Sequence, residues 1–432
     1  MAETVIFWFR RDLRLEDNTA LFHALKRNER ILPMFIFDTE ILQKLPAKND
    51  ARLTFIHQQV QHLKKTLEGF GSSLLVKHGK PIEVFRKLKK DYNISSVYAN
   101  HDYEPYAVAR DKAVKGLLDR EGVKFHTYKD QVIFEKDEIL KKDGKPYTVY
   151  TPYSKKWKAS LSGDALEMRE VLSLKKHFFK CDPFPEISLE DIGFLKSNLS
   201  FPPAEIDREL IRNYEQYRNI PAVDGTSRLG LHLRFGTISI RKLVGIAKEI
   251  SETFLGELIW REFFMMILWH FPESTVHAFK RKYDNIPWRN NEKEFEAWCN
   301  GKTGYPMVDA GMRQLNETGF MHNRVRMIAG SFLVKHLLID WRWGETYFAE
   351  KLLDYEQASN VGNWQWVAGS GCDAAPYFRI FNPFTQQEKF DHDNKYVRRW
   401  VSEWDTEQYP EMLVNHKDAR ERALKEYKQA IK

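Results

Sequence analysis

The regular alternation of short apolar runs with amphipathic segments over residues 1–130 most strongly limits what this chain can fold into. Five runs are short and apolar enough to be strands: 5–9, 31–37, 73–76, 95–99 and 123–128. Segments with apolar residues at helical spacing separate several of them, at 53–67, 81–90 and 107–120. Because strands that alternate with helices form parallel sheets covered on both faces, this region predicts an α/β domain with a doubly wound, five-stranded parallel sheet.

The turn after the first strand lacks a nucleotide-binding motif. A dinucleotide-binding domain carries Gly-x-Gly-x-x-Gly there, whereas this chain has the charged stretch RRDLRLEDN at 10–18. The later GSGCDA at 369–374 fits a similar spacing, but it follows a tryptophan-rich segment and not a strand. We therefore interpret it as a turn or packing feature.

Two further regions complete the predicted organisation. Residues 131–203 are rich in lysine and proline and show little periodicity, which indicates an interdomain linker. From 204 to 432, apolar residues recur at helical spacing and strand signals are scarce. A chain of 432 residues is long enough for two cores. We expect an α/β domain at 1–130, the linker at 131–203, and an all-α domain at 204–432.

Composition excludes several classes of protein. A hydrophobic content of 43% with 29% charged residues is typical of a globular chain. The three cysteines, Cys181, Cys299 and Cys372, are far apart, which argues against a zinc site and a disulfide framework. Neither a Gly-x-Ser-x-Gly elbow nor a Walker lysine motif occurs, so hydrolysis has no support. The net charge of +7 is compatible with a polyanionic partner and equally with a mildly basic enzyme.

Hydropathy bears on where the protein acts. The apolar run at 5–9 is too short for the apolar part of a signal peptide. The longest apolar run, at 263–269, is far shorter than a membrane span. We expect a soluble, cytoplasmic monomer that has no membrane contact and no metal ion.

Tryptophan is concentrated in the second half of the chain. Ten of the twelve tryptophans lie at or after residue 260, and Trp364 and Trp366 stand among glycine, alanine and serine. A buried indole needs a partner for its ring N–H, so this arrangement is unusual for a plain core. The surrounding stretch, 354–383, therefore predicts a site that stacks flat rings.

Two polar motifs each allow a functional and a structural interpretation. GTSRLG at 225–230 suits a phosphate through its hydroxyls, backbone N–H groups and arginine, but it also resembles a helix N-cap. Glu257, Trp260 and Arg261 share one helical face. That face suits contact with a base edge, stacking and a phosphate, or else it is an amphipathic helix with a Glu–Arg pair.

A third motif, HNRVRM at 322–327, places Asn323, Arg326 and Met327 on one helical face and turns Arg324 aside. Its arginines suit a polyanion or a partner for Asp354. The alternative is a solvated helix turn.

Taken together, these segments resemble the DNA photolyase/cryptochrome family over essentially the whole chain. The likeness rests on segments that occur in the family's order: WFRRDLRLEDNTAL, GTSRL, ELIWREF, GKTGYPMVDAGMRQL, MHNRVRM, NWQW and DAAPYFRIFNP. The chain is most similar to the bacterial class I photolyases that act on cyclobutane pyrimidine dimers. The resemblance implies FAD bound in a U shape within the helical domain.

The resemblance also implies which residues hold the cofactor. Its phosphates and ribityl chain fall to Tyr214, Thr226, Ser227, Arg228 and Leu229. The residues around the ring system are Asn323, Arg326, Asp354, Glu356 and Asn360, with Arg326 and Asp354 paired and Asn360 beside flavin N5. Glu356 departs from the aspartate of the bacterial enzymes, and Phe254 replaces a tryptophan.

For the substrate, the resemblance implies DNA with ultraviolet-induced pyrimidine dimers, flipped out of the duplex. The pocket-lining residues are Glu257, Trp260, Arg261, Asn323, Arg324, Met327 and Trp366. Trp260 and Trp366 form an apolar wedge, and Glu257 contacts the pyrimidine while excited reduced FAD donates an electron. Trp288, Trp341 and Trp364 match a relay that carries electrons from the surface to the flavin.

Three matters stay open at this stage. The N-terminal domain of this family often holds an antenna chromophore, here a folate, a deazaflavin, a flavin or none. A cryptochrome-type photoreceptor is the main rival function, and repair of (6-4) photoproducts is another. The retained Asn360 and Trp-x-Trp favour dimer repair over signalling, and the absence of histidine from RVRMIAGSF argues against (6-4) repair.

Overall fold

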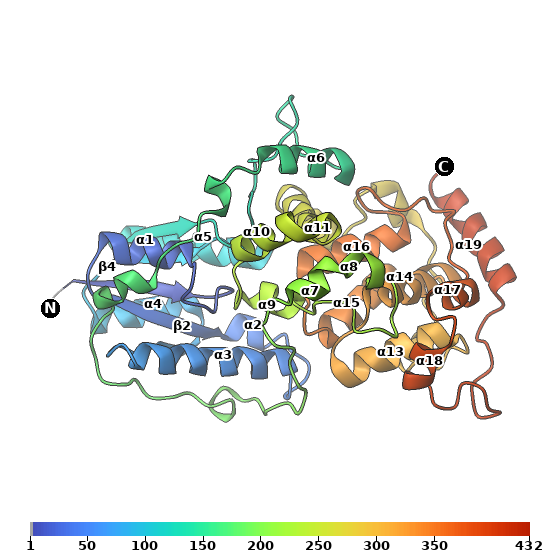
Figure 1. Cartoon of the computed structure of the whole chain (residues 1–432), viewed down its shortest axis with the longest axis horizontal. Helices are drawn as coiled ribbons and strands as arrows, with labels where there is room; N and C mark the ends of the chain where they lie inside the picture. The colour runs from blue at the N-terminus through green and yellow to red at the C-terminus, as the bar shows by residue number, and fades with distance from the viewer. Residues whose placement is uncertain (1–2) are drawn as a thin grey trace. The chain divides into compact units, whose positions relative to one another are not determined.

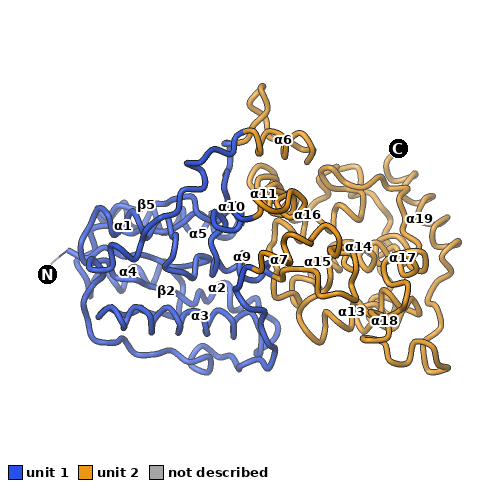
Figure 2. The backbone as a smooth tube through the Cα atoms, in the orientation of Figure 1, with its two compact units in different colours: residues 1–138, 160–206, 229–246 blue, residues 139–159, 207–228, 247–432 orange. Residues whose placement is uncertain are grey.

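The computed structural model describes residues 3–432, and the chain forms two compact units (Figure 2). The first unit comprises residues 1–138, 160–206 and 229–246, and the second comprises 139–159, 207–228 and 247–432. The units therefore interleave along the sequence. Residues 139–159 group with the helical unit and residues 229–246 with the sheet, whereas the sequence expectation put these segments in the linker and in the helical domain.

The first unit contains the expected five-stranded parallel sheet (Figure 1). Its strands are β1 (Thr4–Phe9), β2 (Ile31–Asp38), β3 (Leu75–Gly79), β4 (Ile94–Asn100) and β5 (Lys124–Tyr128). They follow the order β3-β2-β1-β4-β5, and every neighbouring pair is parallel. The predicted doubly wound fold is confirmed. The apolar runs predicted this fold correctly because central parallel strands are buried on both faces, and β1 and β2 are fully buried.

Helices cover this sheet. They are α1 (Thr19–Arg27), α2 (Thr39–Leu42), α3 (Ala51–Glu68), α4 (Pro81–Asp91) and α5 (Pro105–Arg120), with α9 (Gly230–Phe235) joining the unit from later in the chain. Ile6 and Trp8 of β1 share an apolar cluster with Phe85 of α4 and Leu117 of α5. One face of the sheet is thus covered by α4 and α5.

The charged stretch after β1 forms a buried network of ion pairs, which we call the arginine knot: Arg14, Asp17, Asp130 and Arg241. Arg14 and Arg241 donate to Asp130 at 2.7 and 2.8 Å, and Arg241 also donates to Asp17 at 2.8 Å. Thr19 donates to Asp130 through its backbone N–H and its hydroxyl. The two arginines hold the pKa of Asp130 at about 2, against the cost of its burial. The later part of the charged stretch, which contains Arg14 and Asp17, therefore has a structural role.

The second unit is helical, as predicted (Figure 1). Its helices are α6 (Tyr150–Ser160), α7 (Arg208–Arg212), α8 (Tyr214–Tyr217), α11 (Glu252–His270), α12 (Glu292–Cys299), α13 (Pro306–Thr318), α14 (Asn323–Ser331), α15 (Trp341–Lys351), α16 (Gln357–Ala368), α17 (Pro383–Phe390), α18 (Lys395–Trp400) and α19 (His416–Ala430), with a π-helical turn at Phe332–His336. Helix α10 (Ile240–Ile250) begins among residues of the first unit.

Close packing between α15 and α16 organises the helical core. A Cβ atom on Gly344 of α15 would lie 2.1 Å from the indole of Trp364 on α16, so only glycine allows this approach. Helix α16 ends at Gly369, whose φ of 84° continues the chain in the left-handed conformation. Trp364 and Trp341 are buried in the apolar cluster of this unit, and α16 thereby presents its remaining polar residues to a cavity.

Candidate flavin and DNA site

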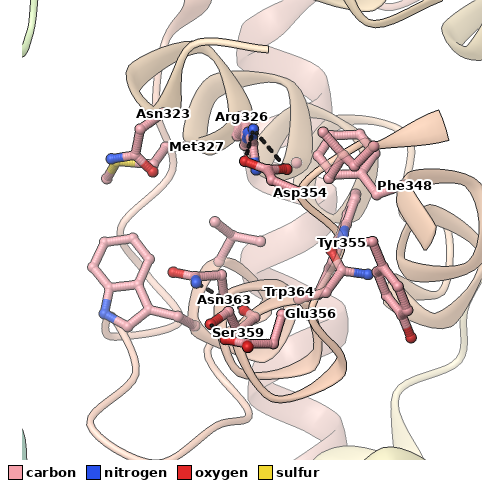
Figure 3. A pocket seen from close by; sticks show the side chains of 15 residues that line it. Asn323, Arg326, Met327, Phe348, Asp354, Tyr355, Glu356, Ser359, Asn363 and Trp364 are labelled. Atoms are coloured by element: carbon pink, nitrogen blue, oxygen red, sulfur yellow. Dashed lines mark hydrogen bonds and ion pairs between the residues drawn. The ribbon is translucent and has the colours of Figure 1, made fainter. Parts of the chain in front are cut away.

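A cavity of about 620 Å³, part of it open to solvent, lies beside α14 and α16 of the helical unit (Figure 3). Many of the residues that the sequence singled out line it: Asn323, Arg326, Met327, Asp354, Glu356, Asn360, Trp364 and Trp366. Phe348, Tyr355, Ser359 and Asn363 also line it, although no sequence pattern pointed to them. The structure thus gathers two distant motifs, HNRVRM and the stretch after Asp354, around one cavity.

The expected ion pair between Arg326 and Asp354 is present in this cavity. The Arg326 Nη2 donates to both carboxylate oxygens of Asp354, at 3.2 and 2.9 Å, as Figure 3 shows. The Arg326 Nε donates to the backbone oxygen of Met321 at 2.7 Å, which fixes the guanidinium at the start of α14. The pair therefore supplies one oriented positive and one oriented negative group at the cavity wall.

Asn360 projects from α16 with its amide held by α15. Its Nδ2 donates to the backbone oxygen of Glu345 at 3.0 Å and to Glu345 Oε1 at 2.9 Å. Burial raises the pKa of Glu345, and the hydrogen bond from Asn360 partly opposes this. The sequence did not point to Glu345, because a lone glutamate on an amphipathic helix carries no signal.

Arg261 lies against Glu356. Its Nη2 is 3.1 Å from Glu356 Oε1, and both side chains are largely buried. Glu356 also precedes the first turn of α16, where a carboxylate is favourable to the helix dipole. Arg261 thus neutralises Glu356, the residue that departs from the family pattern. This differs from the expectation, in which Arg261 contacts a phosphate from the helical face that it shares with Glu257 and Trp260.

Trp260 is stacked on Tyr150, with ring centroids 3.6 Å apart and planes 5° apart. The Tyr150 hydroxyl donates to the backbone oxygen of Gly256 at 2.8 Å, and burial raises the pKa of Tyr150 to about 12. The sequence assigned Tyr150 to the linker, since nothing local to it suggests a site. Because Tyr150 is the first residue of α6, this stacking packs the start of α6 on α11.

Glu257, on the same helix as Trp260, is paired with Arg218. The Arg218 Nη1 lies 2.5 Å from Glu257 Oε1. Burial raises the pKa of Glu257 while Arg218 lowers it, and burial dominates. Arg218 was also missed by the sequence reasoning, although its guanidinium lies over the ring of the predicted residue Tyr214 at 5.3 Å.

Positively charged groups converge beside the cavity, and we call Arg218, Arg324 and Arg379 the open arginine cluster. Arg324 donates to Asn219 at 2.7 Å and its guanidinium lies 4.4 Å from the ring centroid of Phe390. Arg379 lies over Trp366 at 5.8 Å. Burial lowers the pKa of Arg324, and repulsion from Arg218 and Arg379 lowers it further. Such mutual repulsion is relieved by an anion.

In the GTSRLG motif at 225–230, no single contact marks a phosphate site. Arg228 has a left-handed φ of 51°, pairs with exposed Asp224 at 3.1 Å, and lies over Phe320. Leu229 is buried, and Tyr214 meets Phe254 edge to face at 5.1 Å. Thr226 and Ser227 precede this turn. The Phe254 substitution therefore keeps an aromatic contact with Tyr214.

The helical unit has features that FAD would satisfy. His322 accepts a hydrogen bond from the backbone N–H of Arg324 through Nδ1, so its Nε2 carries the proton. Within residues 3–432, that buried Nε2 has no hydrogen-bond partner. Burial and four arginines (Arg326, Arg324, Arg218 and Arg228) lower the pKa of His322 to about 4. The unpartnered N–H of His322 and the four nearby arginines suit the diphosphate of a dinucleotide such as FAD.

The three relay tryptophans belong to one apolar cluster. Trp341 and Trp364 are buried in it, and Trp288 is half-buried and packs against it. A fourth indole, Trp298, is fully buried and lies edge to face with Trp364 at 6.1 Å. The sequence analysis did not assign Trp298 a role, because its spacing from Trp364 in the chain carries no information about contact.

A second cavity, of about 810 Å³ with part of it open to solvent, lies in the sheet unit. It is bounded by residues at the carboxyl ends of β1, β2 and β4, among them Phe9, Phe37 and Asp102. In open α/β sheets, ligands bind at this edge where the strand order reverses, here between β1 and β4. Aromatic side chains line it together with the guanidinium groups of Arg10, Arg11, Arg110 and Arg234.

Two kinds of feature are absent from the part of the chain that the structure describes. Among residues 3–432, no group of three or more His, Cys, Asp and Glu side chains could hold a metal ion. No helix within the same residues has the length and apolar character needed to cross a membrane.

Known proteins are similar to this chain along nearly all of its length. A family model described as the FAD binding domain of DNA photolyase matches residues 254–406, and one described as DNA photolyase matches residues 5–172. A deoxyribodipyrimidine photo-lyase from Agrobacterium fabrum is 37% identical, with 98% of this chain and 97% of the relative covered.

Two solved structures are similar as well. A bacterial class III photolyase from Agrobacterium tumefaciens has a TM-score of 0.88 and 35% identity, covering 100% of this chain and 98% of the other. An archaeal photolyase from Sulfolobus tokodaii, described as holding two FAD molecules, has a TM-score of 0.85 and 34% identity, covering 99% and 100%. The expected likeness to class I enzymes stays a prediction.

Proposed function

Because the chain belongs to the DNA photolyase family, we propose that it repairs DNA by splitting cyclobutane pyrimidine dimers with light, using FAD as its cofactor. The observation that carries this proposal is the cavity in the helical unit, which gathers the predicted ring-contacting polar residues and the aromatic side chains of Trp364 and Trp366. Reduced FAD bound here would supply light-driven electron transfer to the dimer.

The polar residues of the helical unit hold this cofactor. Asn323, Arg326, Asp354, Glu356 and Asn360 surround the ring system, and all five line the cavity. The phosphates and ribityl chain of FAD are bound by Tyr214, Thr226, Ser227, Arg228 and Leu229. The arginines that lower the pKa of His322 supply positive charge nearby. Since the Arg326–Asp354 pair has no net charge, it orients the ring through hydrogen bonds, while the wider arginine field offsets anionic charge.

The rim of the cavity receives the lesion. Met327 and Trp366 are apolar walls of the cavity itself, and Trp260 offers a large ring already aligned by Tyr150. Stacking on such surfaces stabilises a dimer that has left the duplex and excludes water from it. A dimer costs less to flip than intact bases, because its bases pair poorly.

Glu257 forms the hydrogen bond to the pyrimidine. Burial raises the pKa of this carboxyl, and Arg218, at 2.5 Å, opposes that shift and orients the carboxyl. The positive charge of Arg218 beside it would stabilise negative charge on the ring as the electron arrives.

The open arginine cluster binds the DNA backbone around the flipped dimer. Guanidinium groups that repel one another are favourable partners for phosphates, whose binding also releases counterions. Arg324 and Arg379 are held over Phe390 and Trp366, and this orients their charges without neutralising them. Arg261, paired with Glu356, serves the cavity wall, and its contact with DNA is indirect.

Repair is tested by illuminating the FAD-reduced protein with an oligonucleotide that contains one cyclobutane thymine dimer. We expect restored thymines in proportion to the light absorbed by the flavin. A second oligonucleotide with a (6-4) photoproduct is expected to stay unrepaired. If neither lesion is repaired while FAD is bound, the rival photoreceptor function is favoured.

Trp288, Trp341 and Trp364 would relay electrons to bound oxidised FAD from an external reductant, such as a thiol, at the protein surface. Trp364→Phe is expected to block photoreduction of oxidised FAD, because phenylalanine is not oxidised as indole is, yet to leave repair by chemically reduced protein nearly intact. Absorbance of the flavin under continuous light measures the first, and thymine recovery the second. Equal loss of both activities contradicts the relay.

The cavity in the sheet unit binds the antenna chromophore. Its aromatic lining and position at the carboxyl ends of the strands favour a planar conjugated ring system. The arginines that line it are paired with Asp102, Glu104 and Asp111. Both flavins and folates have such a ring system. Titration with FMN, a deazaflavin and a methenyl folate distinguishes the sources, with the loss of antenna absorbance in Arg110→Met as the check on location.

The two units are assigned different roles. We infer that the sheet unit is the antenna domain and the helical unit the catalytic domain, and that the protein acts on DNA in the cytoplasm as a monomer. Light scattering of the FAD-loaded protein tests its oligomeric state.

A further inference from the structure

Four aromatic rings lie along one edge of the sheet unit, and we call them the ring ladder: His23 of α1, Tyr98 of β4, and His126 and Tyr128 of β5. His23 stacks on Tyr128, with ring centroids 4.4 Å apart and planes 17° apart. The rings of Tyr128 and Tyr98 are 5° from parallel at 6.2 Å, and Tyr98 meets His126 at 4.6 Å. The fold thus aligns rings from three elements, which no spacing in the sequence predicts.

The ring ladder lies at an open border of the sheet. Strand β5 ends the strand order, so β4 is its single neighbour in the sheet. Along β5, His126 and Tyr128 alternate with Phe125, which packs on the apolar cluster that includes residues of α4 and α5. His126 and Tyr128 therefore project from the other face, where α1 packs on β4 and β5 (Figure 2). His23, His126 and Tyr128 are each half-buried, so part of each ring is accessible from solvent.

Hydrogen bonds from the end of α1 hold the two tyrosine rings. The Arg27 Nη1 donates to the Tyr128 hydroxyl at 3.1 Å, and the Asn28 Nδ2 donates to the Tyr98 hydroxyl at 3.2 Å. The same Nδ2 donates to the backbone oxygen of Ala24 at 3.0 Å, which fixes the amide. Because these rings are already oriented, a ligand that stacks on them loses less conformational entropy.

The cations beside the ring ladder are Lys26, Arg27, Lys124 and Arg169. Lys26, Arg27 and Lys124 are exposed, and among residues 3–432 no carboxylate forms an ion pair with them. Arg169 pairs with exposed Glu167, but its buried Nε has no hydrogen-bond partner within the same residues. Positive charge and one unused donor therefore remain for a ligand.

The two histidines show that this charge reaches both ends of the ladder. Burial and then three of the cations lower the pKa of His23: Arg27, Arg169 and Lys26. Burial and then Arg27 and Lys124 lower the pKa of His126. The cations thus lie close enough to act on a group that stacks at either end.

Rings beside unpaired cations suit a strand of nucleic acid whose bases are free. Every base has a flat face that stacks on an aromatic ring, and the cations bind the phosphates. In a duplex the bases already stack on one another, so this surface meets only the phosphates. We propose that the ring ladder and its cations bind single-stranded nucleic acid, through the bases and phosphates that DNA and RNA share. None of the four rings lines either cavity, so this surface is additional to the proposed repair site.

The test is fluorescence anisotropy of labelled (dT)12 and (rU)12, two strands without lesions, with the full-length protein in the dark. We expect His23→Ala and His126→Ala each to weaken binding at least about fivefold, the lower end of the range for a base on an aromatic side chain. Arg27→Gln is expected to reduce the slope of log K against log salt by about 0.7, since one phosphate contact on a single strand is lost. These losses with either strand support the proposal, and the tighter-binding strand identifies the ligand as DNA or RNA.

The matched controls are His62→Ala and Lys65→Gln, which remove one imidazole and one charge from exposed positions on α3 of the same unit. Both are expected to bind the strands like the parent protein. Melting temperatures of all variants separate loss of binding from loss of folding. Unchanged affinity for both strands in folded His23→Ala and His126→Ala overturns the proposal, as does an equal loss in the controls.

Competition locates the bound strand. An excess of unlabelled duplex that contains a thymine dimer is expected to leave most of the labelled strand bound, because the flipped dimer is directed to the cavity of the helical unit. Complete displacement by the duplex places the strand in the repair site and overturns the proposal. Because binding of these strands needs neither light nor a lesion, a protein that repairs nothing still tests this inference.

Discussion

The two units each contain a cluster of arginines, and the clusters differ in how far carboxylates neutralise their charge. In the arginine knot of the sheet unit, Arg14 and Arg241 are buried against Asp17 and Asp130. In the open arginine cluster of the helical unit, Arg324 and Arg379 have aromatic neighbours, and only Arg218 has a carboxylate, Glu257. The first cluster is neutralised by carboxylates of the chain, whereas the second is neutralised only at Arg218.

This difference separates a structural role from a binding role. Buried charges that are fully paired cost little once formed, but losing one partner is expensive. Charges that repel one another beside a cavity weaken the unbound protein slightly and bind anions tightly. The pKa values agree, because that of Asp130 is lowered to about 2 whereas those of Glu257 and Glu345 are raised by burial.

Breaking the knot should have the largest effect. Arg241→Met leaves Asp17 and Asp130 with fewer partners and is expected to cost about 3–5 kcal/mol of unfolding free energy, the usual penalty for half of a buried pair. Urea unfolding followed by circular dichroism measures it. Lys242→Met is the control, since Lys242 forms only an exposed pair with Glu16 and should change stability by less than about 1 kcal/mol.

Removing a ring from the open site should lower the affinity for damaged DNA. Trp260→Ala is expected to weaken binding to dimer-containing DNA by about 1–3 kcal/mol, the range for stacking of a base on an aromatic side chain. Fluorescence anisotropy with labelled DNA measures the loss. Trp260→Phe keeps a flat ring and should recover most of it; unchanged affinity in the alanine variant would contradict the wedge.

Acid should weaken the knot. The pKa of Asp130 is lowered from 3.8 to about 2, so the folded state binds a proton less readily than the unfolded state. Its contribution, about 2 kcal/mol, is present above pH 4 and is lost as the pH falls from about 4 to about 2. Urea midpoints at several pH values measure it. In Asp130→Asn this part of the acid dependence should vanish, and its persistence would refute the assignment.

The smallest effect is expected from one charge of the open cluster. Arg379→Gln should change the unfolding free energy by no more than about 0.5 kcal/mol. It should lower DNA affinity and reduce the slope of log K against log salt by about 1, since one phosphate contact is lost. Binding at several salt concentrations tests this. A loss of stability comparable to that of Arg241→Met would erase the distinction between the clusters.

The sequence predicted the sheet well because central parallel strands are buried on both faces and so are recognisable as apolar runs. The observed β1, Thr4–Phe9, and β2, Ile31–Asp38, differ from the expected runs by one residue at one end. The boundaries of the compact units could not be read in this way. Residues 229–246 contribute to the sheet unit through contacts such as Arg241 with Asp17, and no local pattern reveals a partner more than 200 residues away.

Motifs in the sequence determined which residue types gather at the site, because their order matches a family and their chemistry suits rings and phosphates. The tertiary structure alone decided their partners: Tyr150 on Trp260, Arg218 on Glu257, and Glu345 on Asn360. Each of these partners comes from another segment of the chain, and its identity depends on how helices pack. Spacing along a helix fixes which side chains share a face, whereas the angle and distance between helices fix what that face meets.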